Sequence, residues 1–259
     1  IAECMDVRIP TMVALDGFIS SHAMENVIVE ADNEIAEFIG KFNALHPLLD
    51  TDNPKTIGSM NMTDYYFEHK INQLQGIENA RKMIKEIGKE FGNSFGRYYG
   101  FFESYKLEDA DFALILVGSA AGTAKELIDD LRSNGEKVGL LKLRVLRPFP
   151  YAELQEALAG IKAAAVLERV STPGSHGGPL FNETRCALYD LEKRPLIIPY
   201  VYGLGGRDTR MTHFADILEE LLELNEKNRA STGNENKVRY VNLREEPAEL
   251  KEEVNEVHG

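Results

Sequence analysis

The sequence is poor in cysteine and in positive charge, and it has no tryptophan. Its two cysteines, Cys4 and Cys186, cannot supply the four thiolates of an iron–sulfur cluster or the usual four-ligand structural zinc site. They do not form a short-spaced redox pair either, so we expect two thiols in a reducing cytoplasm. The 29 basic residues against 42 acidic ones give a formal net charge of −13, which disfavours binding to nucleic acid or to an anionic membrane.

The chain also lacks long hydrophobic runs. No apolar stretch approaches the ~20 residues that cross a bilayer, and no signal-peptide pattern opens the chain. The first residue is Ile1, and a buried strand is predicted soon after it, with no earlier element to pair with. We therefore expect residues to be missing upstream. A hydrophobic fraction of 43% in 259 residues suffices for one large domain or two moderate ones.

The central part of the chain alternates apolar strands with amphipathic helices. The predicted strands are 111–118, 137–145, 163–170 and 194–203. The predicted helices follow them at 123–134, 151–159, 180–189 and 211–225. Strands this apolar, alternating with helices, are typical of a parallel sheet covered on both faces, so the fold class is α/β.

The first hundred residues carry fewer elements. We predict a strand at 9–15, a short helix at 32–40, a connector at 45–58 and a long helix from Thr63 to about Phe91. Apolar residues recur every three or four positions along that helix, which would be ~42 Å long and would brace two bodies or lie along a subunit surface. Beyond residue 225 the chain is polar, with one more strand expected at 237–243; a partly disordered terminus is an equal alternative.

Glycine-rich loops follow the predicted strands. Their notable residues are Gly118 and Gly122, then Gly174, Gly177 and Gly178, then Gly203, Gly205, Gly206, Arg207 and Asp208. Because parallel strands end at the same edge of a sheet, these loops are expected to share the edge where ligands or partners bind. The last loop, GLGGRD, has an acid at the sixth position of the dinucleotide fingerprint, and GSAAGT lacks the lysine of a P-loop. Nucleotide binding is therefore disfavoured, although an independent nucleotide-binding module is not excluded.

Other candidates for chemistry are few. His176 could act as a general base, but no acid partner is evident, so an ordinary loop imidazole is favoured. The stretch DGFISSH follows the predicted strand at 9–15 directly and offers a carboxylate, two hydroxyls and an imidazole within seven residues. It satisfies no nucleophile or metal-ligand spacing, so composition alone does not make it a site.

Several segments, in this order, resemble the α subunit of pyruvate:ferredoxin oxidoreductase and its 2-oxoacid:ferredoxin oxidoreductase relatives. They are MVALDGFISSH, EFGNSFGRYYGFFESYKLEDAD, VGSAAGTAKELIDDLRSNGEKVGLLKLRVLRPFP and GLGGRD. The resemblance covers roughly residues 1–225. Since RPFP after VGLLKLR also occurs in transketolase-like C-terminal domains, that piece indicates only the superfamily.

The resemblance implies a domain organisation. Residues 1–104 would be the end of a pyrimidine-type thiamine diphosphate domain plus a long connecting helix, residues 105–225 a transketolase C-terminal-like parallel-sheet domain, and residues 226–259 a polar tail. The front of the first domain would carry the glutamate that activates the aminopyrimidine and the residues that grip the 2-oxoacid. That front is expected to be absent here, so the chain alone should be inactive.

The resemblance also implies the chemistry. The family decarboxylates a 2-oxoacid, pyruvate by default, on thiamine diphosphate with Mg²⁺, passes electrons singly through 4Fe–4S clusters to ferredoxin, and transfers the acyl group to coenzyme A. The reverse direction is equally open. The clusters and most pyrophosphate contacts would belong to β, γ and δ type partner subunits, in agreement with the low cysteine count.

The residues that the resemblance places near the catalytic cleft, on the substrate or coenzyme A side, are Asp16, Gly17, Ser20, Ser21 and His22. The alternative is that DGF only forms the tight turn that leaves a strand. The glycine loops are expected to be structural or interface turns, with Arg207 and Asp208 holding GLGGRD in place. A component of another thiamine-dependent 2-oxoacid dehydrogenase or transketolase, or a noncatalytic assembly subunit, remains an open alternative.

Overall fold

The computed structural model describes residues 7–227 and 237–244. Within it the chain divides into two compact units. One unit comprises Ile1–Phe101 and Val145–Pro148, and the other comprises Phe102–Arg144 and Phe149–Gly259.

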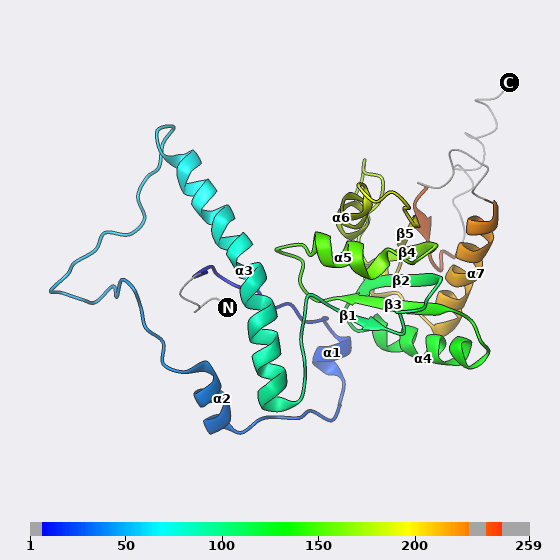
Figure 1. The fold of residues 1–259 in the computed structure, drawn as a ribbon, viewed down its shortest axis with the longest axis horizontal. Helices are drawn as coiled ribbons and strands as arrows, with labels where there is room; N and C mark the ends of the chain where they lie inside the picture. The colour runs from blue at the N-terminus through cyan, green and yellow to red at the C-terminus, as the bar shows by residue number, and fades with distance from the viewer. Residues whose placement is uncertain (1–6, 228–236, 245–259) are drawn as a thin grey trace. The chain divides into compact units, whose positions relative to one another are not determined.

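The long helix dominates the first unit. Helix α3 (Tyr66–Phe95) confirms the periodicity of the sequence and ends at Gly96, whose φ of +73° is the left-handed conformation that glycine adopts without a Cβ clash (Figure 1). Its buried positions recur every four residues: Ala80, Ile84, Gly88 and Gly92. Two of them are glycines because the chain after α3 packs against the helix backbone. A Cβ on Gly88 would lie 1.8 Å from the carbonyl oxygen of Tyr99.

Two short helices precede α3. Helix α2 (Asp32–Ile39) confirms the predicted helix at 32–40, and the stretch 45–58 is irregular, as predicted. Phe38 of α2 packs edge-on against two α3 rings, Phe91 at 5.5 Å and Phe95 at 5.6 Å between centroids. Aromatic contacts of this geometry stabilise by about 0.5–1.5 kcal/mol each beyond the area that they bury, which explains how α2 is held.

The strand predicted at 9–15 is wrong. These residues are irregular, and the side chains of Met12 and Val13 are each 92% exposed. A strand needs a neighbour for its backbone N–H and C=O groups. In the described part of the chain, every strand belongs to a sheet formed by residues of the second unit, and none pairs with this segment. Apolar composition alone therefore gave no strand.

The second unit is built on a six-stranded sheet in the order β1-β3-β2-β4-β5-β6. Its strands are β1 (Phe102–Tyr105), β2 (Phe112–Val117), β3 (Val138–Leu143), β4 (Ala163–Glu168), β5 (Leu196–Val201) and β6 (Arg239–Tyr240). Strands β3, β2, β4, β5 and β6 are parallel, and β1 alone runs antiparallel, beside β3. The four strands predicted in the central part are confirmed, whereas β1 was missed because its four residues FESY are short and mixed in polarity.

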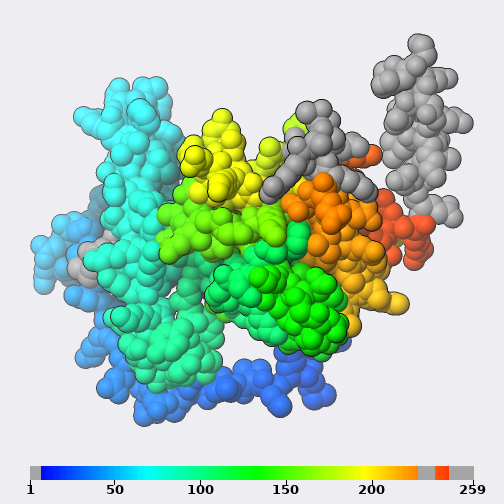
Figure 2. Space-filling view, turned by 45° about the vertical axis from the view of Figure 1, so that its right-hand side comes forward, coloured from blue at the N-terminus to red at the C-terminus, as the bar shows by residue number. Residues whose placement is uncertain are grey.

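Helices cover both faces of this sheet. They are α4 (Ala120–Ser133), α5 (Tyr151–Leu158), α6 (Pro179–Leu188) and α7 (Met211–Lys227), and all four confirm predicted helices. Helices α4 and α7 pack on one face, side by side, and α5 and α6 pack on the other (Figures 1 and 2). Alternate residues of each strand feed the two hydrophobic cores, so Ala165 and Leu167 face α4 and α7 while Ala164 and Val166 face α5 and α6. The expected α/β fold with a parallel sheet is thereby confirmed.

The last strand is fastened by a polar contact. Tyr200 of β5 donates a hydrogen bond to Glu220 of α7 (2.8 Å), and Arg239 of β6 forms an ion pair with the same carboxylate. Burial, together with the hydrogen bond to Glu220, raises the pKa of Tyr200 well above its usual range, so the hydroxyl remains a donor. Strand β6 lies within the strand predicted at 237–243, while most of the predicted tail lies outside the described residues.

Candidate functional site

The glycine loops lie together at one edge of the sheet. Because β2, β3, β4 and β5 are parallel, their carboxyl ends meet there, and the loops after β2, β4 and β5 carry the predicted glycines. Six of these have positive φ between +64° and +95°: Gly118, Gly174, Gly177, Gly203, Gly205 and Gly206. Gly122 lies inside α4, and Gly178 immediately precedes α6.

The strand order singles out one point on this edge. Strands β2 and β4 are neighbours, yet the helix after β2 packs on one face of the sheet and the helix after β4 packs on the other. Such a reversal is the topological switch point, outside which open parallel sheets bind their ligands. The residues that end β2 and β4 are therefore the first candidates for a functional site.

Glu168, the last residue of β4, is a buried carboxylate with an exposed fraction of only 6%. Its two oxygens accept hydrogen bonds from the backbone N–H groups of Leu180 (2.6 Å) and Phe181 (3.0 Å) in the first turn of α6. Burial raises the pKa of Glu168, and these two donors offset part of that effect. A carboxylate at a helix start is favoured by the helix dipole, so Glu168 ties the end of β4 to α6.

The loop between β4 and α6 is shaped around that carboxylate. A Cβ on Gly178 would lie 2.4 Å from Oε2 of Glu168, and a Cβ on Gly177 would lie 2.5 Å from the ring of Phe181. Both glycines are therefore required by close packing. His176, the candidate general base, is exposed in the same loop.

Arg169 follows Glu168 and points to the opposite face, as consecutive residues of a strand do. Its guanidinium lies over the ring of Tyr202, 5.5 Å from the centroid, and Tyr202 is only 2% exposed. A Cβ on Gly203 would lie 2.7 Å from Nε of Arg169. Sequence reasoning missed both Glu168 and Arg169, although a pair of opposite charges closing the apolar run AAAVL was a usable signal.

The GLGGRD loop contains a short 3-10 turn, η1 (Leu204–Gly206), and is held from the side of β6. The guanidinium of Arg207 donates to the carbonyl of Asn242 (2.6 Å), and the Asn242 side chain donates to the carbonyl of Asp208 (3.4 Å). Arg207 thus acts through its side chain and Asp208 through its backbone.

The DGFISSH residues lie in the first unit and form one local turn. Helix α1 (Ile19–His22) contains Ser20, Ser21 and His22, and Asp16 and Gly17 precede it. The hydroxyl of Ser21 accepts a hydrogen bond from the N–H of Phe18 (2.8 Å), and the ring of His22 stacks on Phe18 at 4.9 Å. The serines, the histidine and Gly17 are exposed. The five residues thus lie within one short stretch, and the contacts described for Ser21 and His22 are with Phe18.

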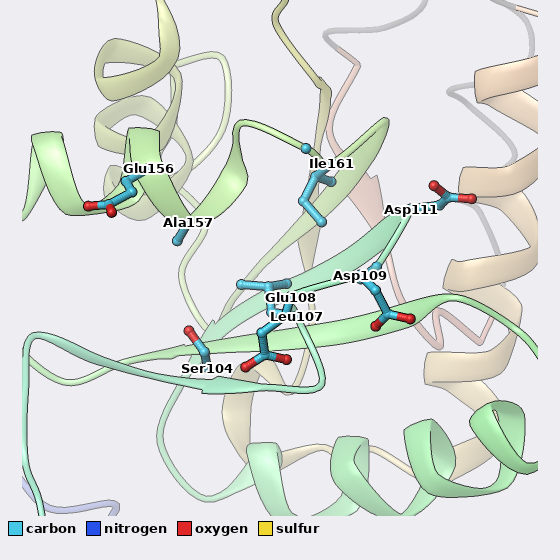
Figure 3. Close-up of a pocket in the computed structure, with 10 residues that line it drawn as sticks. Ser104, Leu107, Glu108, Asp109, Asp111, Glu156, Ala157 and Ile161 are labelled. Atoms are coloured by element: carbon cyan, nitrogen blue, oxygen red, sulfur yellow. The ribbon is translucent and has the colours of Figure 1, made fainter.

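A cavity of about 400 Å³ lies at the opposite end of the strands, next to the residues that precede β2 and β4 (Figure 3). Its lining includes four carboxylates, Glu108, Asp109, Asp111 and Glu156. Two of them are paired outside the cavity, Asp109 with Arg132 and Asp111 with Lys162. Figure 3 shows Asp111 and Glu156 pointing away from each other. The acids do not converge on a common point, so the cavity lacks the arrangement of a catalytic or metal site.

Two family models match the chain in tandem. The model described as "Pyruvate flavodoxin/ferredoxin oxidoreductase, thiamine diP-bdg" matches residues 1–89, and the model described as "Pyruvate:ferredoxin oxidoreductase core domain II" matches residues 110–214. The chain belongs to the pyruvate:ferredoxin oxidoreductase family. This confirms the resemblance seen in the sequence motifs, and the second match coincides with the parallel-sheet unit.

Individual relatives agree with this family. The chain is 43% identical over 247 residues to pyruvate synthase subunit PorA of Thermotoga maritima, covering 95% of this chain and 60% of that protein. It is 39% identical over 216 residues to ketoisovalerate oxidoreductase subunit VorA of Pyrococcus horikoshii, covering 83% of this chain and 55% of that protein. The chain spans about 60% of the length of the pyruvate synthase subunits that it matches.

A solved structure of the wider family was also matched. It is 2-oxoglutarate:ferredoxin oxidoreductase from Magnetococcus marinus with 2-oxoglutarate, coenzyme A and succinyl-CoA bound. The sequences are 21% identical, the TM-score is 0.45, and the match covers 67% of this chain and 28% of that one. A likeness this distant assigns no residue of this chain a role.

The described residues and the cysteine count bear on where metal ions could bind. Among residues 7–227 and 237–244, no group of three or more His, Cys, Asp or Glu side chains could hold a metal ion. The whole sequence has only two cysteines, whereas a 4Fe–4S cluster takes four. In the same described residues, no helix is long and apolar enough to span a bilayer.

Proposed function

We propose that this chain is part of the α subunit of a thiamine-diphosphate-dependent 2-oxoacid:ferredoxin oxidoreductase that acts on pyruvate. The reaction takes pyruvate, coenzyme A and two oxidised ferredoxins to acetyl-CoA, carbon dioxide, a proton and two reduced ferredoxins, or runs in reverse. The observation that carries the proposal is the tandem match of residues 1–89 and 110–214, in family order, within one chain. The 43% identity to a pyruvate synthase subunit supports pyruvate as substrate.

A second substrate is favoured by a specific observation. The ketoisovalerate oxidoreductase subunit is 39% identical, close to the value for the pyruvate relative. A branched-chain 2-oxoacid such as 2-oxoisovalerate is therefore the alternative. Both substrates carry the same reacting 2-oxo carboxylate and differ only in the alkyl group.

The chain is proposed to work only as a member of a complex, in the cytoplasm. Because the described residues offer no metal site and the sequence has two cysteines, the proposal assigns Mg²⁺ and the 4Fe–4S clusters to partner subunits of the β, γ and δ type. Thiamine diphosphate supplies the carbanion chemistry when bound. The contribution proposed for this chain is structural support, together with the turn at α1, which we place near the catalytic cleft.

The direct test is to purify the complex through a tag on this chain and to assay it. Pyruvate-dependent reduction of ferredoxin that also requires coenzyme A is expected, with 2-oxoisovalerate and 2-oxoglutarate as parallel substrates. The isolated chain should be inactive. Turnover of a 2-oxoacid by the isolated chain, or a complex that reduces ferredoxin with none of these substrates, would refute the proposal.

The role of the α1 turn is tested in the same complex. We expect His22→Gln and Ser20→Ala to raise KM or to lower kcat, because both side chains are exposed and free to face a substrate. Glu25→Gln, on an exposed side chain just beyond the helix, is the matched control. Unchanged kinetics for both α1 variants would mean that the stretch is only a turn.

The GLGGRD loop is proposed to be an interface turn. A Cβ on Gly205 would have nothing within 4 Å, so Gly205→Val causes no clash with its neighbours. The φ of +65° at this position is, however, a backbone conformation that a β-branched residue rarely adopts. We expect a lower yield of assembled complex with unchanged cofactor affinity. Full assembly with weakened cofactor binding would contradict this assignment.

A further inference from the structure

The guanidinium of Arg169 is an exposed cation without a counter-charge in the described part of the chain. Among the described residues, its one electrostatic contact is the cation–π stacking of the guanidinium on the ring of Tyr202. No hydrogen bond or ion pair joins it to any residue within 7–227 or 237–244. The sequence has 42 acidic residues against 29 basic ones, so a lack of pairing is not forced by a shortage of carboxylates.

The position of this guanidinium is built into the fold. The Tyr202 ring beneath it is buried and is itself packed against Phe214, at 6.4 Å between centroids. Gly203 leaves the space that Nε of Arg169 occupies, since any Cβ there would lie 2.7 Å away. Arg169 is exposed, so a guanidinium that rests on this ring can offer its N–H donors to a ligand in solution.

The nearest carboxylate in the sequence does not neutralise Arg169. Glu168 points to the face covered by α6, and both of its oxygens are used by the N–H groups of Leu180 and Phe181. The start of α6 is thereby already occupied by an internal anion. The face on which Arg169 lies is therefore the one that favours an external anion at this edge.

The switch point brings a second favourable group to that face. The last paired residues of β2 and β4 are Ile115 and Val166. Gly118 and Arg169 follow this pair at the same distance along their strands, so they lie at the same level of the sheet. Helix α4 begins two residues after Gly118 and packs on the Tyr202 face. The partial positive charge at its first turn adds to the charge of Arg169.

We propose that Arg169 is the anion-binding residue of a phosphate-binding site at the carboxyl edge of β4, for a small phosphate-bearing ligand. A guanidinium fork matches two phosphate oxygens, and the switch point is where open parallel sheets receive small ligands. The proposed function assigns no phosphate-binding residue to this unit, so the site goes beyond it. An acidic side chain of a partner subunit would be a different occupant, and the experiment below separates the two.

The probe is inorganic pyrophosphate, titrated calorimetrically into the purified complex saturated with thiamine diphosphate. Arg169→Gln should weaken its binding by about tenfold to a hundredfold, because a charged hydrogen-bonding partner is lost. Arg169→Lys, which keeps the charge but not the planar fork, should give an intermediate loss. Arg194→Gln is the matched control, because Arg194 also stacks on a tyrosine, Tyr189, at 5.5 Å, but precedes β5 at the other edge of the sheet.

Three results would overturn the site. They are equal pyrophosphate affinity in wild type and Arg169→Gln, no pyrophosphate binding by the wild-type complex, and acetate binding as tight as pyrophosphate binding. If Arg169→Gln assembles poorly, Gly203→Ala gives an independent reading, since its Cβ displaces the guanidinium without removing it. A lower yield of assembled complex for Arg169→Gln, with unchanged pyrophosphate binding by the complex that does assemble, would assign the residue to a partner's acid instead.

Discussion

Replacing Gly178 with alanine is expected to loosen the junction between β4 and α6. The new Cβ would lie 2.4 Å from Oε2, 2.6 Å from Cδ and 2.7 Å from Oε1 of Glu168. It would thus strike the whole carboxylate rather than a flexible tip, and Glu168 is buried. To restore an ordinary van der Waals contact, the carboxylate must retreat by about 1 Å.

The magnitude follows from what that retreat breaks. The hydrogen bonds from Leu180 (2.6 Å) and Phe181 (3.0 Å) would be stretched or lost, and each hydrogen bond to a charged acceptor contributes roughly 1.5–3 kcal/mol. Alanine would also raise the free energy of unfolding by about 0.4–1 kcal/mol, because it restricts the conformations of the unfolded chain. This gain applies here because the φ of −86° at Gly178 suits any residue. With partial relaxation, we expect Gly178→Ala to lower the free energy of unfolding by about 2–4 kcal/mol.

Urea denaturation followed by circular dichroism measures this loss on the complete chain. Gly160→Ala is the matched control, since a Cβ there has nothing within 4 Å and the φ is not in the left-handed region. The double variant Gly178→Ala with Glu168→Ala isolates the clash: with the carboxylate gone, alanine should add little further loss. The assigned contact would be refuted if Gly178→Ala lowered the free energy of unfolding by the same amount in the Glu168→Ala background as in the wild type. It would also be refuted if Gly178→Ala caused no loss in the wild type.

Three further outcomes are expected. Gly88→Ala should destabilise α3 by more than the few tenths of a kcal/mol typical of surface changes, because its Cβ would overlap the carbonyl of Tyr99; protease sensitivity of the helix reports it. Tyr200→Phe should lower the free energy of unfolding by about 1 kcal/mol in urea, through loss of the hydrogen bond to Glu220. Burial raises the pKa of Glu168 above its ordinary 4.5, so the folded state binds this proton more tightly than the unfolded state does. The free energy of unfolding of the wild type, measured relative to Glu168→Gln, should therefore be greatest below about pH 4.5. It should fall as the pH rises through the raised pKa.

Much of the parallel-sheet unit could be predicted because its elements are locally encoded. Strands such as β2 and β4 are apolar on both faces, and helices such as α4 and α7 carry a clear apolar stripe. Each of these patterns is complete within a single element and needs no knowledge of neighbours. The motif order then pointed to the family, which no single segment could have done.

The failures lie where structure depends on distant residues. The apolar stretch 9–15 reads as a strand, but a strand exists only beside another. Conversely, β1 carries a weak pattern and forms because the edge of β3 is available to pair with it. The role of Gly178 was also out of reach, since its constraint comes from a carboxylate ten residues earlier whose position is set by the sheet.

The end of β4 shows how two consecutive charged residues can serve opposite faces of one sheet. Since neighbouring side chains of a strand alternate, Glu168 reaches the start of α6 while Arg169 reaches Tyr202 on the other side. Each charge is matched by a glycine, Gly178 or Gly203, that leaves room for it. The carboxylate is paired with two backbone N–H groups of α6, whereas the exposed guanidinium has only its contact with Tyr202 among the described residues, so the two charges of this edge serve different purposes.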